Sequence, residues 1–255
     1  MSIEIVTHVW AGVLPHYAQV LRYHLTAPLR HPVCCPVTFR ICYTPEDQLV
    51  TRVLEEFEEY NQPSYKILRM PLELELLGRR HYGRDLACQN TKADLVWIAD
   101  ADYYWGEGCL TAAYNEWKAR QTYAAKPPAY FPRSCQISLD HALGDKQISR
   151  ATGGLAPDLN PAEFTRHPFD RPIGGTFLVD GNYAREVGYL RGGKWLPPWK
   201  TKAPPFASTR CDVCFRGQAK RDGKITPVEL PNLFRIRHSE TTVCNSKWRL
   251  PEQLG

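Results

Sequence analysis

The sequence lacks any long hydrophobic run, and no segment of it is repeated. Among its 255 residues, no stretch approaches the ~20 consecutive apolar residues of a membrane-spanning helix. The N-terminal stretch MSIEIVTHVW holds an acid where a secretion signal has basic residues, and its apolar run is short. Hydrophobic residues make up 43% and charged residues 23% of the chain, as in ordinary globular domains. We therefore expect an unexported, cytoplasmic protein with no transmembrane segment.

The chain also lacks a disulfide framework. Its nine cysteines are odd in number and follow no regular spacing, so we expect most of them to be small core residues in a reducing compartment. One pair differs, because Cys211 and Cys214 form a CxxC motif. Together with His238 and Cys244 they offer four possible zinc ligands, although the gap between Cys214 and His238 is long for a zinc finger. A zinc-binding module is therefore one alternative.

Positive charge is unevenly distributed along the chain. From Arg185 to the end there are 14 Lys and Arg against 6 Asp and Glu, a net +8, whereas the whole chain carries only +5. A basic C-terminal third suits an anionic partner such as a nucleotide phosphate, a nucleic acid or an acidic lipid, and it suits a solvated surface equally well. A non-catalytic nucleic-acid-binding protein is therefore a second alternative.

Strand and helix patterns alternate through the first half of the chain. Alternating or continuous apolar residues predict strands at 3–10, 37–44, 64–71 and 94–100. Helical spacing predicts helices at 14–25, 44–60, 74–93 and 109–120, the second with Thr44 as N-cap and Pro45 in its first turn. This order indicates an α/β fold with a mostly parallel, doubly wound sheet, in which ligands bind at the carboxyl ends of the strands.

The pattern weakens after the helix at 109–120. Residues 126–172 are rich in proline and glycine and show no long period, so we expect an irregular region that covers one end of the sheet. A strand, a turn at Asp180-Gly181 and a short helix are expected within 174–190.

The fourth predicted strand runs into two carboxylates, Asp100 and Asp102. Acids at positions i and i+2 of an extended chain point the same way, and two converging carboxylates repel unless a cation neutralises them. A hard divalent ion such as Mg²⁺ or Mn²⁺ would do so; otherwise the pair would cap a turn or helix. The aromatic residues 103–105 that follow would wall a ligand site or belong to the core.

Several segments together resemble glycosyltransferases of the GT-A fold. ADLVWIADADYYW is similar to their DxD signature, and RPIGGTFLVDGNYAREVGYL to their acceptor-side glycine segment. THVW, GRRHYGRDLACQNTKA, RCDVCF and FRIRHSE fall in the family's order, and the branch resembled is the family-2 type. Two features depart from the family: Cys211-Asp212 stands in place of a Glu-Asp pair, and Thr7-His8 in place of Pro-x-Tyr-Asn.

The resemblance implies a single domain over residues 1–255. Residues 1–125 would form the nucleotide-sugar-binding half, and residues 126–255 the acceptor-side and metal-completing half. The implied activity is metal-dependent transfer of a hexosyl or pentosyl group from a nucleotide-sugar donor to a hydroxyl, with inversion of the anomeric configuration. The acceptor would be a glycan or, given the basic C-terminal third, a modified DNA base.

The resemblance also assigns roles to individual residues. It implies donor contacts by Thr7, Arg84, Asp100 and Asp102, acceptor contacts by Gly174, Gly175, Trp195 and Trp199, and ligation of Mn²⁺ or Mg²⁺ by Asp100, Asp102 and His238. Asp212 would be the base that deprotonates the acceptor. The alternatives are a surface Asp212 paired with Arg210 or Arg216, a helix-surface Arg84 and a structural His238.

Overall fold

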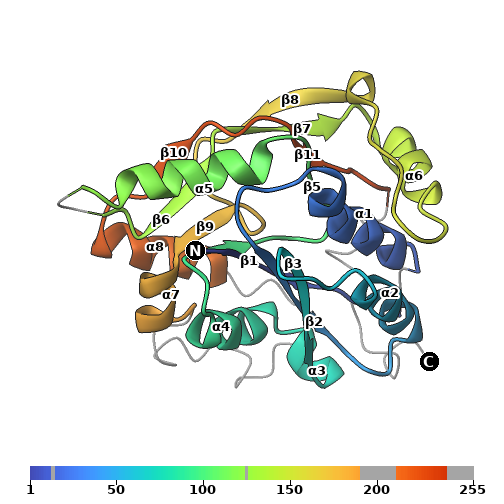
Figure 1. Ribbon diagram of the computed structural model, residues 1–255, viewed down its shortest axis with the longest axis horizontal. Helices are drawn as coiled ribbons and strands as arrows, with labels where there is room; N and C mark the ends of the chain where they lie inside the picture. The colour runs from blue at the N-terminus through green and yellow to red at the C-terminus, as the bar shows by residue number, and fades with distance from the viewer. Residues whose placement is uncertain (13–14, 124–125, 190–210, 240–255) are drawn as a thin grey trace.

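The computed structural model describes residues 1–12, 15–123, 126–189 and 211–239. Its main layer is a seven-stranded sheet with the strand order β10-β6-β9-β4-β1-β2-β3 (Figure 1). The strands of this sheet are β1 (Ile3–His8), β2 (Val37–Tyr43), β3 (Tyr65–Pro71), β4 (Leu95–Ile98), β6 (Ala129–Pro132), β9 (Phe177–Asp180) and β10 (Thr226–Val228). All neighbours pair in parallel except β9, which runs antiparallel to both β4 and β6. The expected mostly parallel α/β sheet is confirmed.

Helices cover both faces of this sheet. The helices within the described residues are α1 (Tyr17–Arg30), α2 (Gln48–Glu58), α3 (Leu74–Leu77), α4 (Arg80–Asn90), α5 (Cys109–Arg120), α6 (His141–Ser149), α7 (Gly181–Val187) and α8 (Cys211–Asp222), with a 3-10 turn at Pro161–Glu163. Of these, α6 packs against α1 and the second sheet described below. Along β1, Ile3 and Ile5 belong to one buried cluster and Val6 to another, so both faces of the strand are buried. This explains why its apolar residues do not alternate cleanly with polar ones.

Residues 126–172 are more regular than the sequence suggested. They contain β6, β7 (Ser134–Ser138), α6 and β8 (Phe164–Pro168), and the expectation of an irregular region was wrong. A second sheet has the order β5-β11-β7-β8, with β5 (Tyr103–Trp105) and β11 (Leu233–Arg235). Each of these strands has only three to five residues, which is too short for a period to be recognised in the sequence.

The start of α2 also differs from the prediction. The helix begins at Gln48, and its N-cap is Asp47, whose Oδ1 accepts a hydrogen bond of 3.1 Å from the amide of Val50. Thr44, the expected cap, instead accepts a hydrogen bond from the amide of Asp47 through its carbonyl oxygen, which makes a turn before the helix. The second oxygen of Asp47 accepts a 2.5 Å hydrogen bond from the amide of Ala11 and so fixes the loop after β1.

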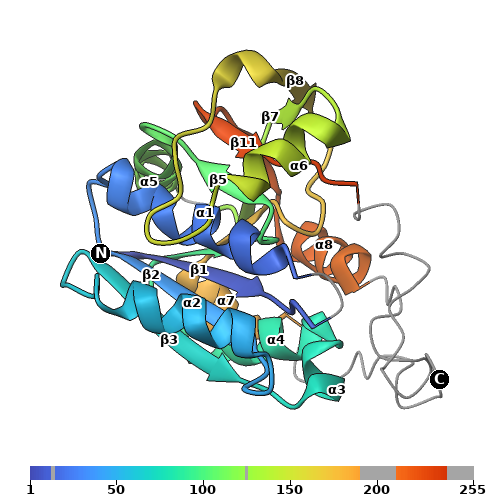
Figure 2. The ribbon, with the colours of Figure 1, turned by 90° about the vertical axis from the view of Figure 1, so that its right-hand side faces the viewer.

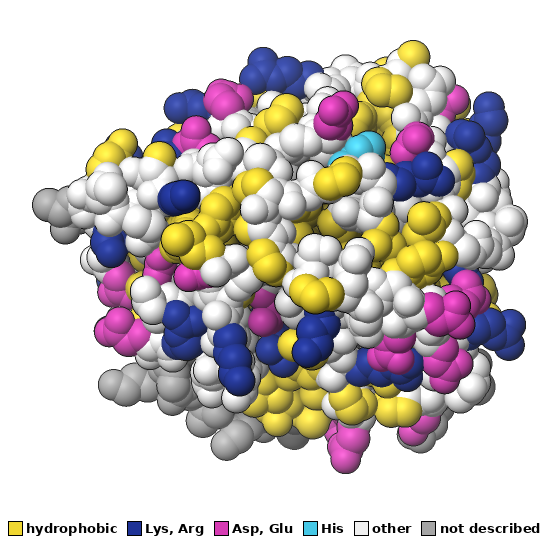
Figure 3. Space-filling model, viewed as in Figure 1, with side chains coloured by type: hydrophobic (Ala, Val, Ile, Leu, Met, Phe, Trp, Pro, Cys, Tyr) yellow, Lys and Arg dark blue, Asp and Glu magenta, His cyan; other side chains and the backbone are white. Residues whose placement is uncertain are grey.

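The surface and the cysteines agree in part with the composition. On the face shown in Figure 3, basic and acidic side chains are interspersed rather than gathered by sign.

Five of the expected core cysteines are buried, whereas Cys34 is exposed. Within the described parts of the chain, no helix combines the length and apolarity needed to cross a membrane.

One histidine joins the two sheets. His24 of α1 is fully buried, and α1 lies between β1 and β5 (Figure 2). Its Nε2 lies 2.7 Å from the hydroxyl of Thr7 in β1, and its Nδ1 lies 2.9 Å from the carbonyl oxygen of Tyr103 in β5. Since a carbonyl can only accept, Nδ1 carries the proton and Nε2 accepts from Thr7. A neutral imidazole therefore forms one hydrogen bond to each of the two sheets.

This contact predicts a loss of stability in acid. Burial lowers the pKa of His24 from its ordinary 6.5 to about 4, against the opposing effects of the Tyr103 carbonyl and Asp100. Between these pH values the unfolded chain binds the proton and the native chain does not, so the free energy of unfolding falls as the pH falls from 6.5 towards 4. We expect the fall between pH 7 and pH 4 to be smaller in His24→Gln than in the parent, by on the order of 3 kcal/mol.

Denaturant unfolding at several pH values measures this difference. His167→Gln is the matched control, because His167 is exposed, and its pH dependence should match that of the parent. Equal pH dependence in His24→Gln and the parent would show that His24 is not a neutral bridge.

Candidate functional site

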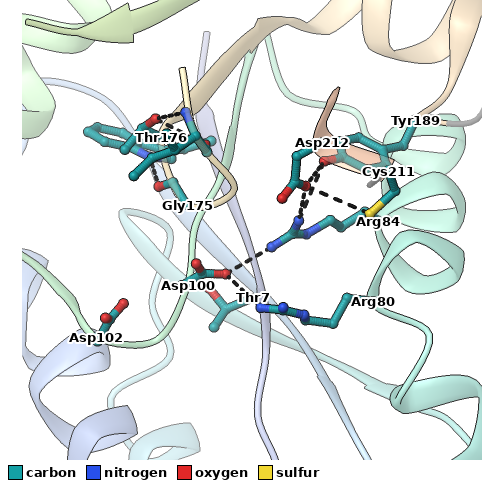
Figure 4. Close-up of polar contacts among 12 residues, drawn as sticks. Thr7, Arg80, Arg84, Asp100, Asp102, Gly175, Thr176, Tyr189, Cys211 and Asp212 are labelled. Carbon is teal, nitrogen blue, oxygen red and sulfur yellow. Dashed lines mark hydrogen bonds and ion pairs between the residues drawn. The ribbon is translucent and has the colours of Figure 1, made fainter. Parts of the chain in front are cut away.

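Most of the polar residues singled out in the sequence meet at the carboxyl end of β4. The strand consists of four fully buried apolar residues, and the chain then turns through Asp100 and Asp102 towards β5. The loop before β9 and the first turn of α8 reach the same place (Figure 4). The site therefore combines segments that are distant in sequence at the sheet edge where α/β folds bind ligands.

Asp100 is paired with two arginines of α4. Its Oδ1 lies 2.9 Å from a terminal nitrogen of Arg84 and 3.4 Å from one of Arg80. Burial raises the pKa of Asp100, but the guanidinium groups of Arg80, Arg84 and Arg235 outweigh burial, and the pKa lies below its ordinary value. Asp100 is therefore an ionised carboxylate within a cationic surrounding.

Asp102 turns to a different partner. Its Oδ2 accepts a 2.9 Å hydrogen bond from Arg235 of β11, and its Oδ1 is buried with no hydrogen-bond partner among the described residues. Burial raises its pKa, with a further contribution from the charge of Asp100, while Arg235 opposes both. Because the chain turns after β4, the two carboxylates separate instead of converging, as Figure 4 shows.

Arg84 joins Asp100 to Asp212. It is almost completely buried, and its second terminal nitrogen lies 2.8 Å from Oδ1 of Asp212, in the first turn of α8. The same Oδ1 accepts a 2.5 Å hydrogen bond from the hydroxyl of Tyr189. Arg216, one sequence-based candidate partner of Asp212, instead donates to the carbonyl oxygen of Pro172; the other, Arg210, lies outside the described residues.

The loop at Gly174-Gly175 packs closely against these acids. A Cβ atom on Gly174 would lie 2.7 Å from Oδ2 of Asp212 and 3.8 Å from Oδ2 of Asp100. A Cβ atom on Gly175 would lie 2.6 Å from the ring of Tyr103 and 3.0 Å from the amide of Asp100. The Oδ2 atoms of both carboxylates, which have no hydrogen-bond partner within the described part of the chain, therefore face one point on the loop, where only glycine leaves space.

The aromatic residues after Asp102 belong to the core. Tyr103, Tyr104 and Trp105 are each at most 2% exposed, and they form β5. The ring of Trp105 packs edge-on against Trp97 and close to His24. Of the two interpretations of these rings, a wall for the ligand site and a part of the core, the structure supports the core.

His238 contacts two other histidines. It is buried, its Nδ1 is 3.3 Å from Nε2 of His16, and its carbonyl oxygen accepts a hydrogen bond from His141. Burial lowers its pKa to about 4. Across residues 1–12, 15–123, 126–189 and 211–239, no group of three or more His, Cys, Asp or Glu side chains is arranged to hold a metal ion.

This finding bears on both metal hypotheses. Asp100, Asp102 and His238 do not form a complete ligand set here, and Cys211, Cys214 and His238 do not form a zinc set. Cys244, the fourth zinc candidate, lies outside the described residues, as do Trp195 and Trp199. The buried Oδ1 of Asp102, which has no hydrogen-bond partner among the residues that the structure describes, does fit a divalent cation, because hard cations take carboxylate oxygens as ligands.

Two residues predicted to contact the nucleotide-sugar donor already use their polar atoms in hydrogen bonds within the protein. The hydroxyl of Thr7 is bonded to His24, and both terminal nitrogens of Arg84 are bonded to carboxylates. Arg80, one turn earlier on α4, has a side chain that is 59% exposed and is the more accessible guanidinium. Its i, i+4 spacing from Arg84 was a usable signal in the sequence. Tyr189, by contrast, carried no pattern that marked it.

The comparisons with known proteins concern the fold. No family model matches the sequence, and neither does any curated protein. The crystal structure of S. aureus TarS 1–349 is similar with a TM-score of 0.55 at 10% identity, covering 94% of this chain and 61% of that one. A second S. aureus TarS structure gives a TM-score of 0.50 at 11% identity, covering 94% and 37%.

A mannosyltransferase from Pyrobaculum calidifontis, PcManGT in complex with GDP-Man and Mn²⁺, gives a TM-score of 0.49 at 12% identity, covering 92% of this chain and 56% of that one. The chain thus spans less than two thirds of the length of each of these three structures. The match to TarS and the sheet order show that this chain has a GT-A-like fold.

Proposed function

We propose that this protein is a glycosyltransferase that moves a sugar from a nucleotide-sugar donor to an acceptor hydroxyl. The observation that carries the proposal is the cluster of Asp100, Arg84 and Asp212 at the carboxyl edge of a glycosyltransferase fold. One carboxylate follows the central strand and the other lies across the glycine loop, with free oxygens facing the same point. This arrangement suits a donor on one side and an acceptor on the other.

The donor side would use Asp100 and the α4 arginines. Asp100 would face the ribose or the sugar, and the exposed guanidinium of Arg80 would pair with a diphosphate oxygen, since arginine binds phosphate with two parallel hydrogen bonds. Thr7 and Arg84 remain proposed donor-side residues. For Arg84 the support is indirect, because its engaged guanidinium holds Asp100 in place.

A divalent cation, Mn²⁺ or Mg²⁺, would be held by Asp102 through its unpartnered Oδ1, and it would neutralise charge on the leaving diphosphate. Asp100 and His238 remain proposed as further ligands. Arg235 holds the other oxygen of Asp102 and so fixes the direction in which the free oxygen points.

The acceptor side would use Asp212 as general base. Its Oδ2 would take the proton of the acceptor hydroxyl as the acceptor oxygen bonds to the anomeric carbon and the bond from that carbon to the diphosphate oxygen breaks. A single base on the face opposite the leaving group gives inversion. Gly174 and Gly175 would let the acceptor approach closely, and Trp195 and Trp199 are proposed to bind it. The acceptor class proposed is a glycan or a modified DNA base, and the sugar a hexosyl or pentosyl group.

Asp212→Asn tests the base. The amide keeps the shape of the side chain but removes its basicity, so turnover should fall by ~10²–10⁴-fold with little change in donor binding. Diphosphate release from a panel of nucleotide sugars with Mn²⁺ or Mg²⁺ measures turnover, and thermal shift measures donor binding. Asp222→Asn is the control, because Asp222 lies at the end of the same helix and bonds to Tyr183, outside the site. Turnover of Asp212→Asn within a few-fold of the parent would remove Asp212 from the mechanism.

Asp102→Asn tests the cation. Loss of the charged oxygen should abolish the part of donor binding that depends on a divalent ion, because an amide is a poor ligand for a hard cation. Calorimetric titration of donor with and without Mn²⁺ measures this part, and circular dichroism checks the fold. Asp158→Asn, with an exposed carboxylate beside Arg30, serves as control. If Asp102→Asn keeps the metal-dependent binding of the parent, the cation is held elsewhere.

A further inference from the structure

The carboxylate of Asp212 is restrained on one of its two oxygens. Oδ1 accepts hydrogen bonds from Arg84 at 2.8 Å and from the hydroxyl of Tyr189 at 2.5 Å. Oδ2 is the oxygen next to Gly174, and the side chain of Asp212 is 33% exposed. The thiol of Cys211 is a third donor to Oδ1, at 3.8 Å. Because an aspartate can rotate about its Cα–Cβ and Cβ–Cγ bonds, donors gathered on one oxygen fix where the other oxygen points.

Tyr189 is itself held from three sides. Its amide donates a 2.7 Å hydrogen bond to Oδ1 of Asp85, the residue after Arg84 on α4. Its ring stacks on Phe215 of α8, with centroids 4.6 Å apart and planes inclined by 23°. The guanidinium of Arg84 lies 5.6 Å from the ring centre. Helices α4 and α8 therefore both position the phenol that bonds to Asp212.

The phenol also remains protonated. Burial and the negative charge of Asp212 raise the pKa of Tyr189 well above its ordinary value, against the opposing effect of Arg84. A neutral phenol beside a carboxylate can only donate to it. The titratable groups that face Asp212 are Arg84 and His81 of α4, Cys211 of α8 and Tyr189 itself.

We propose that Tyr189 is a positioning residue for the catalytic base: its hydroxyl holds Oδ1 of Asp212 so that Oδ2 faces the acceptor at the glycine loop. The inference rests on the proposed function and adds a residue to it. In the transfer step, Oδ2 takes the acceptor proton, and Oδ1 keeps both hydrogen bonds. Tyr189 exchanges no proton with the substrate, so its loss should affect turnover and not donor binding.

Tyr189→Phe is the test, because phenylalanine keeps the stack on Phe215 and loses only the hydroxyl. We expect kcat to fall by roughly 10-fold, with the donor KM within a factor of two of the parent value. A thermal melt checks that the variant is folded.

A second readout does not depend on turnover. In protein labelled with ¹³C-aspartate, the carboxylate resonance of Asp212 is identified by its absence in Asp212→Asn. We expect this resonance to shift in Tyr189→Phe at a fixed neutral pH, because the carboxylate loses one of its hydrogen-bond donors. Tyr183→Phe is the matched control: Tyr183 lies on α7, and its hydroxyl donates a 2.7 Å hydrogen bond to Asp222 outside the site. This control should leave the Asp212 resonance and the turnover unchanged.

Asp85→Ala provides an independent variant. It removes the hydrogen bond to the Tyr189 amide and changes neither the Tyr189 hydroxyl nor the Asp212 carboxylate. It should change turnover and the Asp212 resonance in the same direction as Tyr189→Phe, but less. An unchanged Asp212 resonance together with unchanged turnover in folded Tyr189→Phe would overturn the inference. If the parent releases no diphosphate from any donor, the proposed function fails, while the Asp212 resonance still decides whether Tyr189 holds Asp212.

Discussion

The buried guanidinium of Arg84 is the interaction on which the candidate site depends. Burial of a cation is costly unless its charge is paired, and burial lowers the pKa of Arg84; the carboxylates of Asp212 and Asp100, with the oxygen of Tyr189, outweigh this effect. Conversely, two carboxylates that face the same loop would repel each other without the cation between them. Arg84 therefore joins α4, the end of β4 and the start of α8 into one unit. Removal of Arg84 would leave these two carboxylates facing the same loop without the buried cation between them.

Much of the central sheet could be predicted from the sequence because its signals are local. Parallel strands that are buried on both faces give short apolar runs, such as LVWI in β4, and the helices between them show apolar residues three and four apart, such as Val50, Val53, Leu54 and Phe57 in α2. The smaller sheet could not be predicted in this way. Its strands β5 and β11 pair Leu233 with Trp105, residues far apart in the chain, and no window of sequence contains both. The prolines that suggested an irregular region instead end the short strands β6 and β8.

The site shows the same division. Asp100, Asp212 and the two glycines were identified by short motifs, and the structure brings them together. The partners that give these groups their properties were not identified, because a pairing such as Tyr189 with Asp212 is a fact of three-dimensional packing. A tyrosine after a short helix looks the same in sequence whether it faces solvent or a carboxylate. For His238, the motif placed the residue after a late strand, which is β11 in the structure. The structure pairs the histidine with His16 and His141.

The reversed direction of β9 determines which segments of the chain meet at the candidate site. In a wholly parallel sheet, every loop at the ligand edge leaves a strand. Because β9 runs antiparallel between β4 and β6, the loop that leads into it meets the loop that leaves β4, and its far end, at Asp180, caps α7 on the opposite edge. The segment that carries Gly174 and Gly175 therefore enters the sheet beside the segment that leaves it with Asp100. One inverted strand thus places two segments that are far apart in the chain side by side at one edge of the framework.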